Sequence, residues 1–253
     1  MKKRYIRGAA SAISLFCASL VVTPSLAADF LEPYNPPAPV LDEDTLWDRF
    51  YAGAFVGYGF GTADITTDVP SLLEQSFDIS GAMLGLTVGR NFLLGENDDQ
   101  TPEDDRRLLL GLEADIAWAG MNGNVVGSPD PSYQEAGIDA IGTLRGRIGV
   151  IVGEERKTLA YLTGGAAAAH GYAVLQATGN APRLTASDWM YGYTVGGGVE
   201  RFVNDDVTVK LEYLYTDLAT QIPIDAGGAG GVNTVFHDIR ANHLIRLGLN
   251  YHF

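Results

Sequence analysis

The chain has 253 residues, of which 46% are hydrophobic and 31 are glycine, and its formal net charge is −14. The acidic excess excludes nucleic acid as the main partner, because binding to phosphates requires clustered Lys and Arg side chains. Cys17 is the only cysteine, so a disulfide framework and a metal centre held by several thiolates are also excluded.

A secretory signal peptide is predicted over residues 1–27. Four basic residues precede an uncharged, mostly apolar run over residues 8–22, and small residues follow up to Ala27. The run is too short to span a bilayer comfortably, since a transmembrane helix needs roughly 20 apolar residues. Cleavage after Ala27 would remove Cys17, four of the 17 basic residues and none of the 31 acidic ones, which leaves a net charge of about −18.

Residues 28–48 are predicted to form a periplasmic leader. Proline fixes the backbone and removes a hydrogen-bond donor, so a segment this rich in proline cannot hold a regular helix or sheet. We expect an extended, polyproline-like tail. Its prolines are Pro33, Pro36, Pro37 and Pro39.

After the leader, eight segments of about eleven residues show strand character. Tilted strands of roughly 9 to 11 residues are long enough to cross a bilayer. Alanines make a helix the competing prediction for residues 164–169, but the flanking glycines and the short length favour a strand. The predicted strands are Phe50–Phe60, Ala82–Phe92, Leu108–Trp118, Ala140–Val150, Thr158–Ala168, Met190–Phe202, Val207–Asp217 and His243–Phe253.

The connections between these segments alternate in length, at about 21, 15, 21, 7, 21, 4 and 25 residues. An up-and-down barrel that is inserted from the periplasm has long outer loops and short inner turns. An even number of strands also returns both ends to the periplasm. The connection over residues 93–107 is long for an inner turn, and this pattern does not explain it.

The predicted strands separate an apolar face from a charged one. A soluble barrel such as a lipocalin would show the same alternation with its polar face in water. Here glycines lie on the charged face, where a surface in water would have no need of small residues. Glycines therefore favour a lumen, because the interior of an eight-stranded barrel is just wide enough for side chains to fill it. Charges in a lumen must be paired to offset their desolvation. The predicted lumen network is Glu113, Asp115, Arg145, Arg147, Glu200, Lys210, Glu212 and Arg246.

Aromatic residues gather near both ends of the predicted strands. Two interfacial girdles of this kind flank the apolar band of transmembrane barrels. The inner girdle would contain Phe50, Phe92, Phe202, Tyr251 and Phe253, and the outer one Phe60, Trp118, Tyr191 and Tyr215.

The two ends of the predicted barrel carry the most specific sequence signals. The first strand reads Phe-Tyr-Ala-Gly-Ala-Phe-Val-Gly-Tyr-Gly over residues 50–59, and the last strand ends in Tyr251-His252-Phe253. With the signal peptide and the Pro-rich leader, these segments resemble the porin-like, opacity-type small outer-membrane proteins of alphaproteobacteria, which share the architecture of the OmpA-type membrane domain.

The resemblance implies an all-β fold, an eight-stranded antiparallel up-and-down transmembrane β-barrel over residues 49–253. It also implies location in the outer membrane of a Gram-negative bacterium, with both ends of the barrel periplasmic and loops on the cell surface. Insertion would depend on the barrel-assembly machinery, which would recognise Tyr251 and Phe253 on the last strand.

No catalytic, cofactor or metal site is predicted. The histidines His170, His237, His243 and His252 are scattered and show no spacing that pairs a nucleophile with a base. The acidic stretch over residues 96–105 could bind Ca²⁺ weakly, but it lacks the ligand spacing of an EF-hand and is expected to be a solvated turn.

A non-enzymatic envelope protein that displays surface loops is therefore the first functional hypothesis. A small-solute pore is the second, and a lipid-modifying enzyme is the third. The expected partners are lipopolysaccharide, phospholipid, the assembly machinery and environmental or host ligands at the loops. Phospholipid headgroups would contact a basic collar at the inner rim, which consists of Arg49, Arg90, Arg106, Arg107, Arg156, Lys157 and Arg201.

Overall fold

The computed structural model describes residues 46–67, 75–94, 108–126, 133–176, 183–219, 221–225 and 234–253. The predicted signal peptide and most of the predicted leader lie outside these ranges. So do the acidic stretch over residues 96–105 and the Gly-rich residues 227–231. None of the described residues belongs to a helix that is long and apolar enough to cross a membrane.

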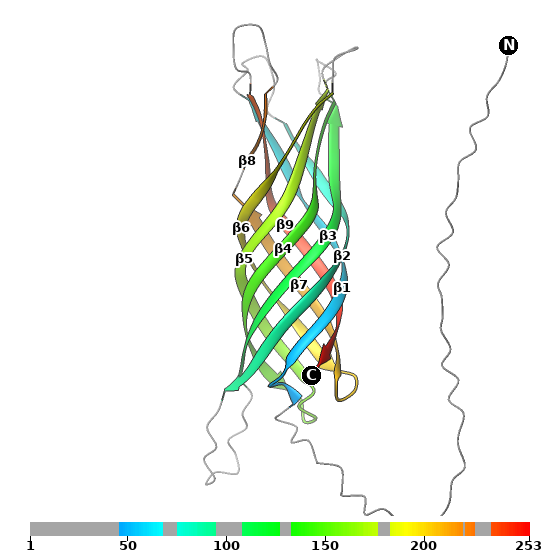
Figure 1. Ribbon diagram of the computed structural model, residues 1–253, viewed down its shortest axis with the longest axis vertical. Coiled ribbons are helices and arrows are strands. Elements are labelled where there is room, and N and C mark those ends of the chain that lie inside the picture. The colour runs from blue at the N-terminus through cyan, green and yellow to red at the C-terminus, as the bar shows by residue number, and fades with distance from the viewer. Residues whose placement is uncertain are drawn as a thin grey trace, which may run out of the picture. The chain divides into compact units, whose positions relative to one another are not determined.

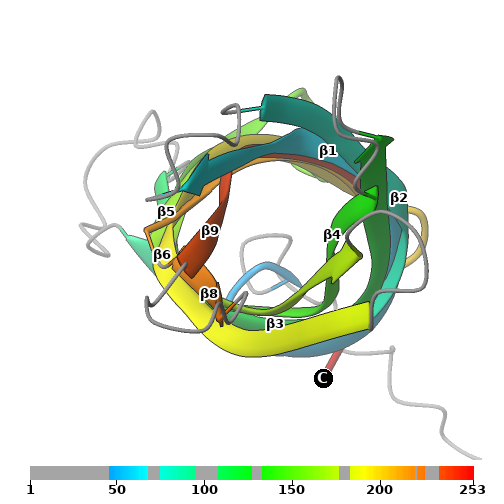
Figure 2. The same cartoon turned by 90° about the horizontal axis from the view of Figure 1, so that it is seen from above.

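The described residues form one closed sheet (Figure 1, Figure 2). Its strands are β1 (Phe50–Thr67), β2 (Gln75–Leu94), β3 (Leu108–Val126), β4 (Tyr133–Val152), β5 (Thr158–Gln176), β6 (Arg183–Phe202), β7 (Val207–Leu218), β8 (Gln221–Asp225) and β9 (Thr234–His252). Neighbours pair antiparallel in chain order, and β9 pairs with both β7 and β1. Because β8 follows β7 along the same side of β9, the ring is eight strands wide, and the predicted eight-stranded antiparallel barrel is confirmed.

The ring closes between its first and last strands. Tyr51 lies opposite His252, and the amide of Phe253 donates a hydrogen bond of 2.9 Å to the carbonyl oxygen of Phe50. The Phe50 and Phe253 rings stack outside this junction, with their centroids 6.4 Å apart. The aromatic end of the last strand therefore seals the barrel against the start of the first.

Seven of the eight predicted strands are longer than expected, with 18 to 20 residues where 11 to 13 were predicted. The exception is β7, which has 12 residues and nearly matches the prediction. The inner ends of the strands agree with the expectation, but β1 was expected to stop at Phe60 and continues to Thr67. The segments expected to be long outer loops are largely strand, so the predicted loop lengths were wrong. The helical alternative for residues 164–169 was also wrong, since they lie within β5.

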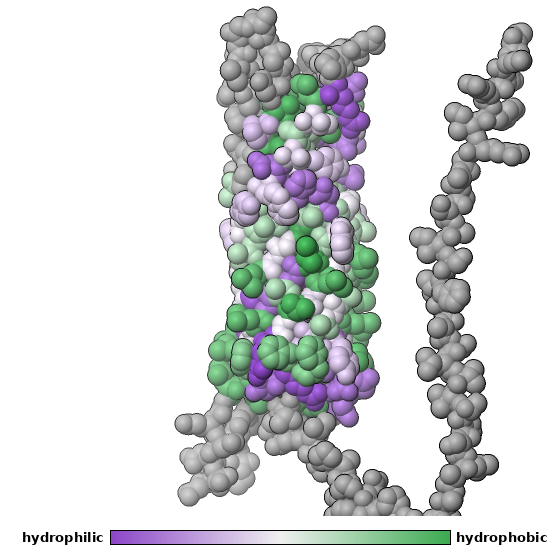
Figure 3. All heavy atoms as spheres, in the orientation of Figure 1, coloured by the Kyte–Doolittle hydropathy of each residue, from purple (hydrophilic) through white to green (hydrophobic). Residues whose placement is uncertain are grey.

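The barrel inverts its polarity along its length. On its outer surface, polar residues gather above the apolar band (Figure 3). In the inner half of β1, Val56 is 55% exposed on the outer surface, as expected for an apolar band that lipid covers. Farther along the same strand Thr62 and Asp64 face outward, while Ala63 and Ile65 are buried inside. The outer half thus has a polar exterior and an apolar interior, as a soluble barrel has.

In β4 and β9 a β-bulge produces this inversion. One extra residue in a strand moves the following side chains to the opposite face. In β4 the bulge is at Asp139, beyond which Ile138 and Ala136 point inward. In β9 it is at Ala241, which adopts a positive φ of 53°. Both bulges lie where the predicted strands ended.

The lumen is filled in three layers. The outer layer is a continuous apolar cluster that includes Ile65, Met121, Ile138 and Leu214. A charged layer lies below it. The inner mouth holds a second apolar cluster, formed by Leu46, Trp47, Leu109, Ile151, Leu159, Tyr161 and Phe202.

Candidate functional site

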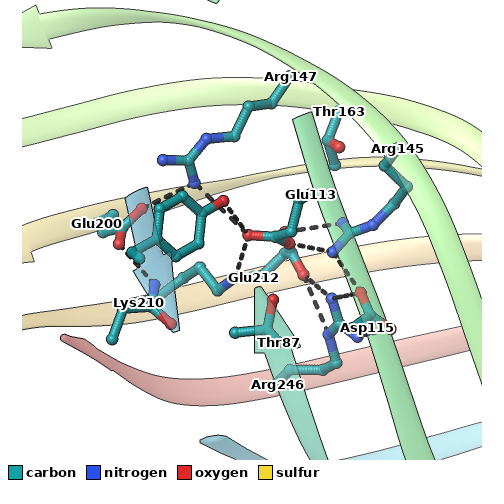
Figure 4. Close-up of polar contacts among 12 residues, drawn as sticks. Thr87, Glu113, Asp115, Arg145, Arg147, Thr163, Glu200, Lys210, Glu212 and Arg246 are labelled. Carbon is teal, nitrogen blue, oxygen red and sulfur yellow. Dashed lines mark hydrogen bonds and ion pairs between the residues drawn. The ribbon is translucent and has the colours of Figure 1, made fainter. Parts of the chain in front are cut away.

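The charged layer of the lumen is the main polar site of the described chain (Figure 4). Its side chains come from β3, β4, β6, β7 and β9, and alternation along each strand points them inward. Arg145 and Glu113 lie directly opposite each other, as do Glu212 and Arg246. The structure brings all eight predicted lumen residues together, and none is more than 8% exposed.

Arg145 is the centre of this network. Its Nη1 donates to Glu212 Oε1 over 2.9 Å, its Nη2 donates to Asp115 Oδ2 over 2.8 Å, and a third ion pair joins it to Glu113. Its Nε donates to the hydroxyl of Thr143 over 2.9 Å. The planar guanidinium supplies several donors in a fixed fork, which suits one cation that must serve three carboxylates.

The other three cations complete the pairing. Arg246 donates to Asp115 Oδ1 over 3.1 Å and to Glu212 Oε2 over 3.0 Å. Arg147 donates to Glu200 Oε2 over 2.9 Å, and Lys210 Nζ donates to Glu113 Oε2 over 2.7 Å.

Four carboxylates and four cations thus form one neutral cluster with charge-assisted hydrogen bonds throughout. Each carboxylate has a cationic partner, so its desolvation is offset.

The alternation of charges did not reveal the neutral members of the network. Tyr51 donates to Glu113 Oε2 over 2.7 Å, and Tyr161 donates to Glu212 Oε1 over 2.9 Å. Thr208 and Asn250 both donate to Glu200 Oε1. Every one of these residues lies on the inward-facing phase of its strand, so the same alternation could have identified them.

Glycine makes room for this crowded layer, as the sequence suggested. A Cβ atom on Gly89 would lie 2.2 Å from Tyr51 Oη and 2.3 Å from Tyr51 Cζ. One on Gly111 would lie 2.7 Å from Arg147 Cγ. All three distances are far below van der Waals contact, so the Tyr51 ring and the Arg147 side chain occupy the volume that a side chain at these glycines would need.

Gly89→Ala is therefore expected to displace Tyr51 from Glu113 and to lower the free energy of unfolding by about 1–3 kcal/mol. Gly146→Ala is the matched control, because Gly146 faces outward and its nearest neighbour would be 4.0 Å from the new Cβ. Urea unfolding in lipid vesicles measures both variants. Equal stability of the two would show that Gly89 is not needed for packing.

The inner mouth is closed by residues that were assigned to the leader. Trp47 is fully buried, and its Nε1 donates a hydrogen bond of 2.8 Å to the carbonyl oxygen of Arg156, in the turn between β4 and β5. Its ring packs edge-on against Phe202, with the centroids 4.6 Å apart. Asp48 then pairs with Arg90 over 3.3 Å. The structure thus places the last three residues of the predicted leader, 46–48, against the barrel.

The described members of the predicted basic collar lie at the inner rim, and three of them, Arg49, Arg90 and Arg201, pair with carboxylates. Arg49 pairs with Asp206 over 3.0 Å, and Arg201 pairs with Glu155 over 2.9 Å. The Arg90 guanidinium also lies 4.4 Å from the Phe50 ring centroid. These pairs reduce the net positive charge that the collar offers to lipid. Contact with phospholipid headgroups stays a prediction, and Arg106 and Arg107 lie outside the described residues.

The three histidines whose side chains the structure describes, His170, His243 and His252, do not converge. On the outer surface, Nδ1 of His170 lies 2.7 Å from Asp139 Oδ1, and Nδ1 of His243 lies 2.6 Å from the Tyr213 hydroxyl. His252 is buried in the inner mouth beside Thr208. Across the part of the chain that the structure describes, no group of three or more His, Cys, Asp or Glu residues could hold a metal ion.

The closed eight-stranded ring, its apolar outer band and its charged lumen define an outer-membrane β-barrel. Residues 15–253 match the family model described as "Outer membrane protein beta-barrel domain". The chain belongs to this family. The alternative of a soluble, lipocalin-like barrel was therefore wrong, and the protein is located in the outer membrane of a Gram-negative bacterium.

Relatives from alphaproteobacteria support the same conclusion. The chain is 29% identical to the 31 kDa outer-membrane immunogenic protein of Brucella melitensis, over 96% of this chain and 99% of that one. It is 27% identical to a 22 kDa outer membrane protein of Rhizobium leguminosarum bv. viciae, over 72% and 69% of the two chains. The predicted resemblance to small outer-membrane barrels is confirmed.

Solved structures show the same fold. The crystal structure of the outer membrane protein OprG from Pseudomonas aeruginosa matches with a TM-score of 0.51 and 16% sequence identity. The match covers 81% of this chain and 96% of OprG. At this level of identity the likeness concerns the fold alone.

Proposed function

We propose that this protein is a closed, non-enzymatic barrel that supports the envelope and presents its outer half and loops at the cell surface. The three filled layers of the lumen carry this proposal. Arg145 and Glu212 are each 1% exposed in the charged layer, and Ile79 and Leu214 are not exposed at all in the apolar layer. A continuous water path would have to cross both layers and displace Trp47.

The length of the strands supports the display part of the proposal. Each of the long strands continues roughly seven to nine residues beyond the outer aromatic girdle, which at about 3.3 Å per residue and a tilt near 40° corresponds to roughly 20 Å. Because the extension has its own apolar core, it needs no lipid to stay folded. The relatives named immunogenic proteins of Brucella favour surface exposure of such a segment.

Reconstitution of the purified protein in planar bilayers tests closure. We expect no steady single-channel current from the wild type, and none from Trp47→Ala, because the outer apolar layer stays in place. A steady current that changes on substitution of Arg145 or Glu113 would contradict the proposal and favour a small-solute pore. A shift in lipid A mass on expression would instead favour a lipid-modifying enzyme.

Assembly and lipid contacts belong to the same proposal. Tyr251 and Phe253 would present the last strand to the barrel-assembly machinery, and their rings, 6.4 Å apart, lie on the outer surface where a partner could reach them. Lipopolysaccharide and phospholipid would surround the two aromatic girdles. Environmental or host ligands would bind at the loops, which lie outside the described residues.

A further inference from the structure

The closed ring does not extend to the outer end of every strand, because the wall opens between β6 and β8. The ladder between β6 and β7 ends at the pair Gly192 and Leu218, and one further hydrogen bond of 2.9 Å joins the amide of Ala219 to the carbonyl oxygen of Tyr191. Beyond this point β8 pairs with β9 alone. Seen from above, the start of β6 and β8 lie apart (Figure 2). Within the described residues, no strand pairs with this side of residues 183–190.

The ladders on either side of β6 show which of its backbone groups face the opening. In an antiparallel ladder the N–H and C=O of one residue point to the same neighbour, and successive residues alternate between neighbours. The carbonyl of Tyr191 bonds to the β7 side, whereas the amide of Phe202 bonds to Lys157 beside β5. The odd-numbered residues of β6 therefore point their backbone groups away from β5. In the opening these residues are Arg183, Thr185, Ser187 and Trp189.

We call residues Arg183–Trp189 the open edge of β6. At its inner end the amide of Trp189 donates a hydrogen bond of 2.7 Å to Asp188 Oδ1, so a side chain takes the place of a neighbouring strand. The rest of the open edge contains no proline, and its pairing with β5 shows no bulge. Prolines and bulges are common devices that keep an edge strand from pairing with another chain. The backbone groups of Thr185 and Ser187 are therefore available to a further strand.

The facing strand, β8, does not supply that further strand. Pro223 lies in the middle of β8 and has no N–H, and proline within a sheet is confined to edge strands and bulges. β8 is thus suited to pair on one side only, with β9, which leaves the open edge of β6 without a partner among the described residues.

The inner side of the opening is apolar. Leu184 and Ala186 point inward and pack against the outer apolar layer, but both are only partly buried. Below them, a Cβ atom on Gly171 would lie 2.5 Å from Met190 Cε and 2.9 Å from Ile222 Cδ1, so these two side chains meet and close the floor. An added strand would cover the exposed parts of Leu184 and Ala186 without disturbing this floor.

We propose that the open edge of β6 binds an extended segment of another protein by β-strand addition. In this mode of recognition, main-chain hydrogen bonds give affinity and alternate side chains give specificity. The segment would run antiparallel to β6, with apolar side chains inward over Leu184 and Ala186 and polar side chains outward. This inference goes beyond the proposed function, because it assigns binding to a strand rather than to the loops. It does not depend on whether the barrel conducts.

Asp188 adds a requirement for a basic residue in the segment. It shares the inward phase of Ala186 and Met190, yet its side chain is exposed, because the wall is open beside it. A Lys or Arg opposite Asp188 would pair with this carboxylate, whereas an acidic residue there would be repelled. The preferred segment therefore alternates apolar and polar residues and has a basic residue at one inward position.

A second copy of this chain in the same membrane does not fit the open edge. Two copies that are inserted in the same direction are related by an axis along the membrane normal. Their β6 strands would then cross at twice the strand tilt, roughly 70–90°. Neighbouring strands of one sheet differ by only about 20–25°. The geometry therefore favours a separate, extended segment as the occupant.

Peptide binding tests the inference. The purified protein in phosphatidylcholine nanodiscs is titrated into a fluorescent peptide of about ten residues, in which Val and Thr alternate and Lys replaces one central Val. Fluorescence anisotropy reports binding. We expect saturable binding by the wild type and weakening of about tenfold or more in Ser187→Pro, which removes one N–H from the open edge. Ser187→Ala is the matched control, because it keeps that N–H, and it should bind as the wild type does.

Methylated peptides test the same ladder in the wild-type protein, so the result stands even if Ser187→Pro does not fold. Ala219 is exposed and donates its amide to β6, and the outward-facing Thr residues of the peptide would do the same. Methylation of the Thr nitrogens should weaken binding by about tenfold or more, whereas methylation of the Val nitrogens should not.

Charge exchange tests the role of Asp188. Replacement of the peptide's Lys by Glu should weaken binding to the wild type, and Asp188→Lys should reverse this preference.

Several results would overturn the inference. These are no binding by the folded wild type, equal binding by Ser187→Pro and Ser187→Ala, and equal binding of the two methylated peptides. Dimerisation of the wild type that Ser187→Pro abolishes would also overturn it, because the open edge would then belong to a second copy.

Discussion

Arg145→Ala should lower the free energy of unfolding by about 3–5 kcal/mol, the cost expected when one partner of a buried ion pair is removed. Arg145 is 1% exposed and serves Glu113, Asp115 and Glu212 at once. With alanine at position 145, these three carboxylates would lose a cation that offsets their desolvation. Water cannot enter this layer to replace the lost cation. Urea unfolding in lipid vesicles measures the loss.

Arg201→Ala is the control for this result. Arg201 forms one ion pair, with Glu155, and its side chain is 57% exposed at the rim. An exposed pair contributes about 1 kcal/mol or less, so this variant should unfold almost as the wild type does. Arg145→Lys should fall between the two, because an ammonium cannot reproduce the fork of the guanidinium. A loss in Arg145→Ala no larger than that in Arg201→Ala would show that the network does not hold the inner half together.

The inner half of the barrel was predictable because one rule governs it. Apolar residues face lipid and charges face the lumen, so residues such as Leu112 and Glu113 separate on a simple alternation. The outer half reverses that rule. In β1 the outer face changes from Phe60 to Thr62, which looks in the sequence like the end of a strand. The strand in fact continues, with polar residues facing outward and apolar residues facing inward.

In β4 and β9, bulges also concealed the continuation of the strand. At Asp139 and Ala241 one extra residue changes the phase of alternation, so the two halves of β4 and β9 cannot be joined by a single period of two. Bulges depend on strand pairing, which one sequence does not display. Strand pairing also explains why only the charged residues of the site were predicted. Charged residues are unusual in the middle of a strand and can be recognised in the sequence. Tyr51 and Asn250 are common strand residues, and only the pairing of strands shows that they contact Glu113 and Glu200.

Trp47 was missed because it precedes the first predicted strand and follows a run of prolines. Its burial depends on the turn between β4 and β5, where Arg156 supplies the acceptor from more than one hundred residues away. No local pattern around residue 47 indicates such a contact. Trp47 is buried by residues that are distant in sequence and that only the closed barrel brings together, so the segment around residue 47 does not determine its burial.

The inversion of polarity predicts opposite responses of two positions in β3 to the same substitution. Leu112 and Asn124 both face outward on this strand, Leu112 in the apolar band and Asn124 in the polar outer half. Leu112→Arg should lower the free energy of unfolding by about 2–4 kcal/mol, the cost of a cation at the lipid-facing midplane of a barrel. Asn124→Arg should change it by about 0.5 kcal/mol or less, as at a water-exposed site.

The comparison isolates the surroundings of the side chain, because both positions lie on the same face of the same strand and receive the same residue. Strand propensity and the entropy of the new side chain therefore nearly cancel, and the difference between the two costs reports whether lipid or water covers each position. Urea unfolding in phospholipid vesicles gives both values. Similar losses at Leu112 and Asn124 would mean that lipid covers the whole strand, and the outer half would then not stand above the membrane.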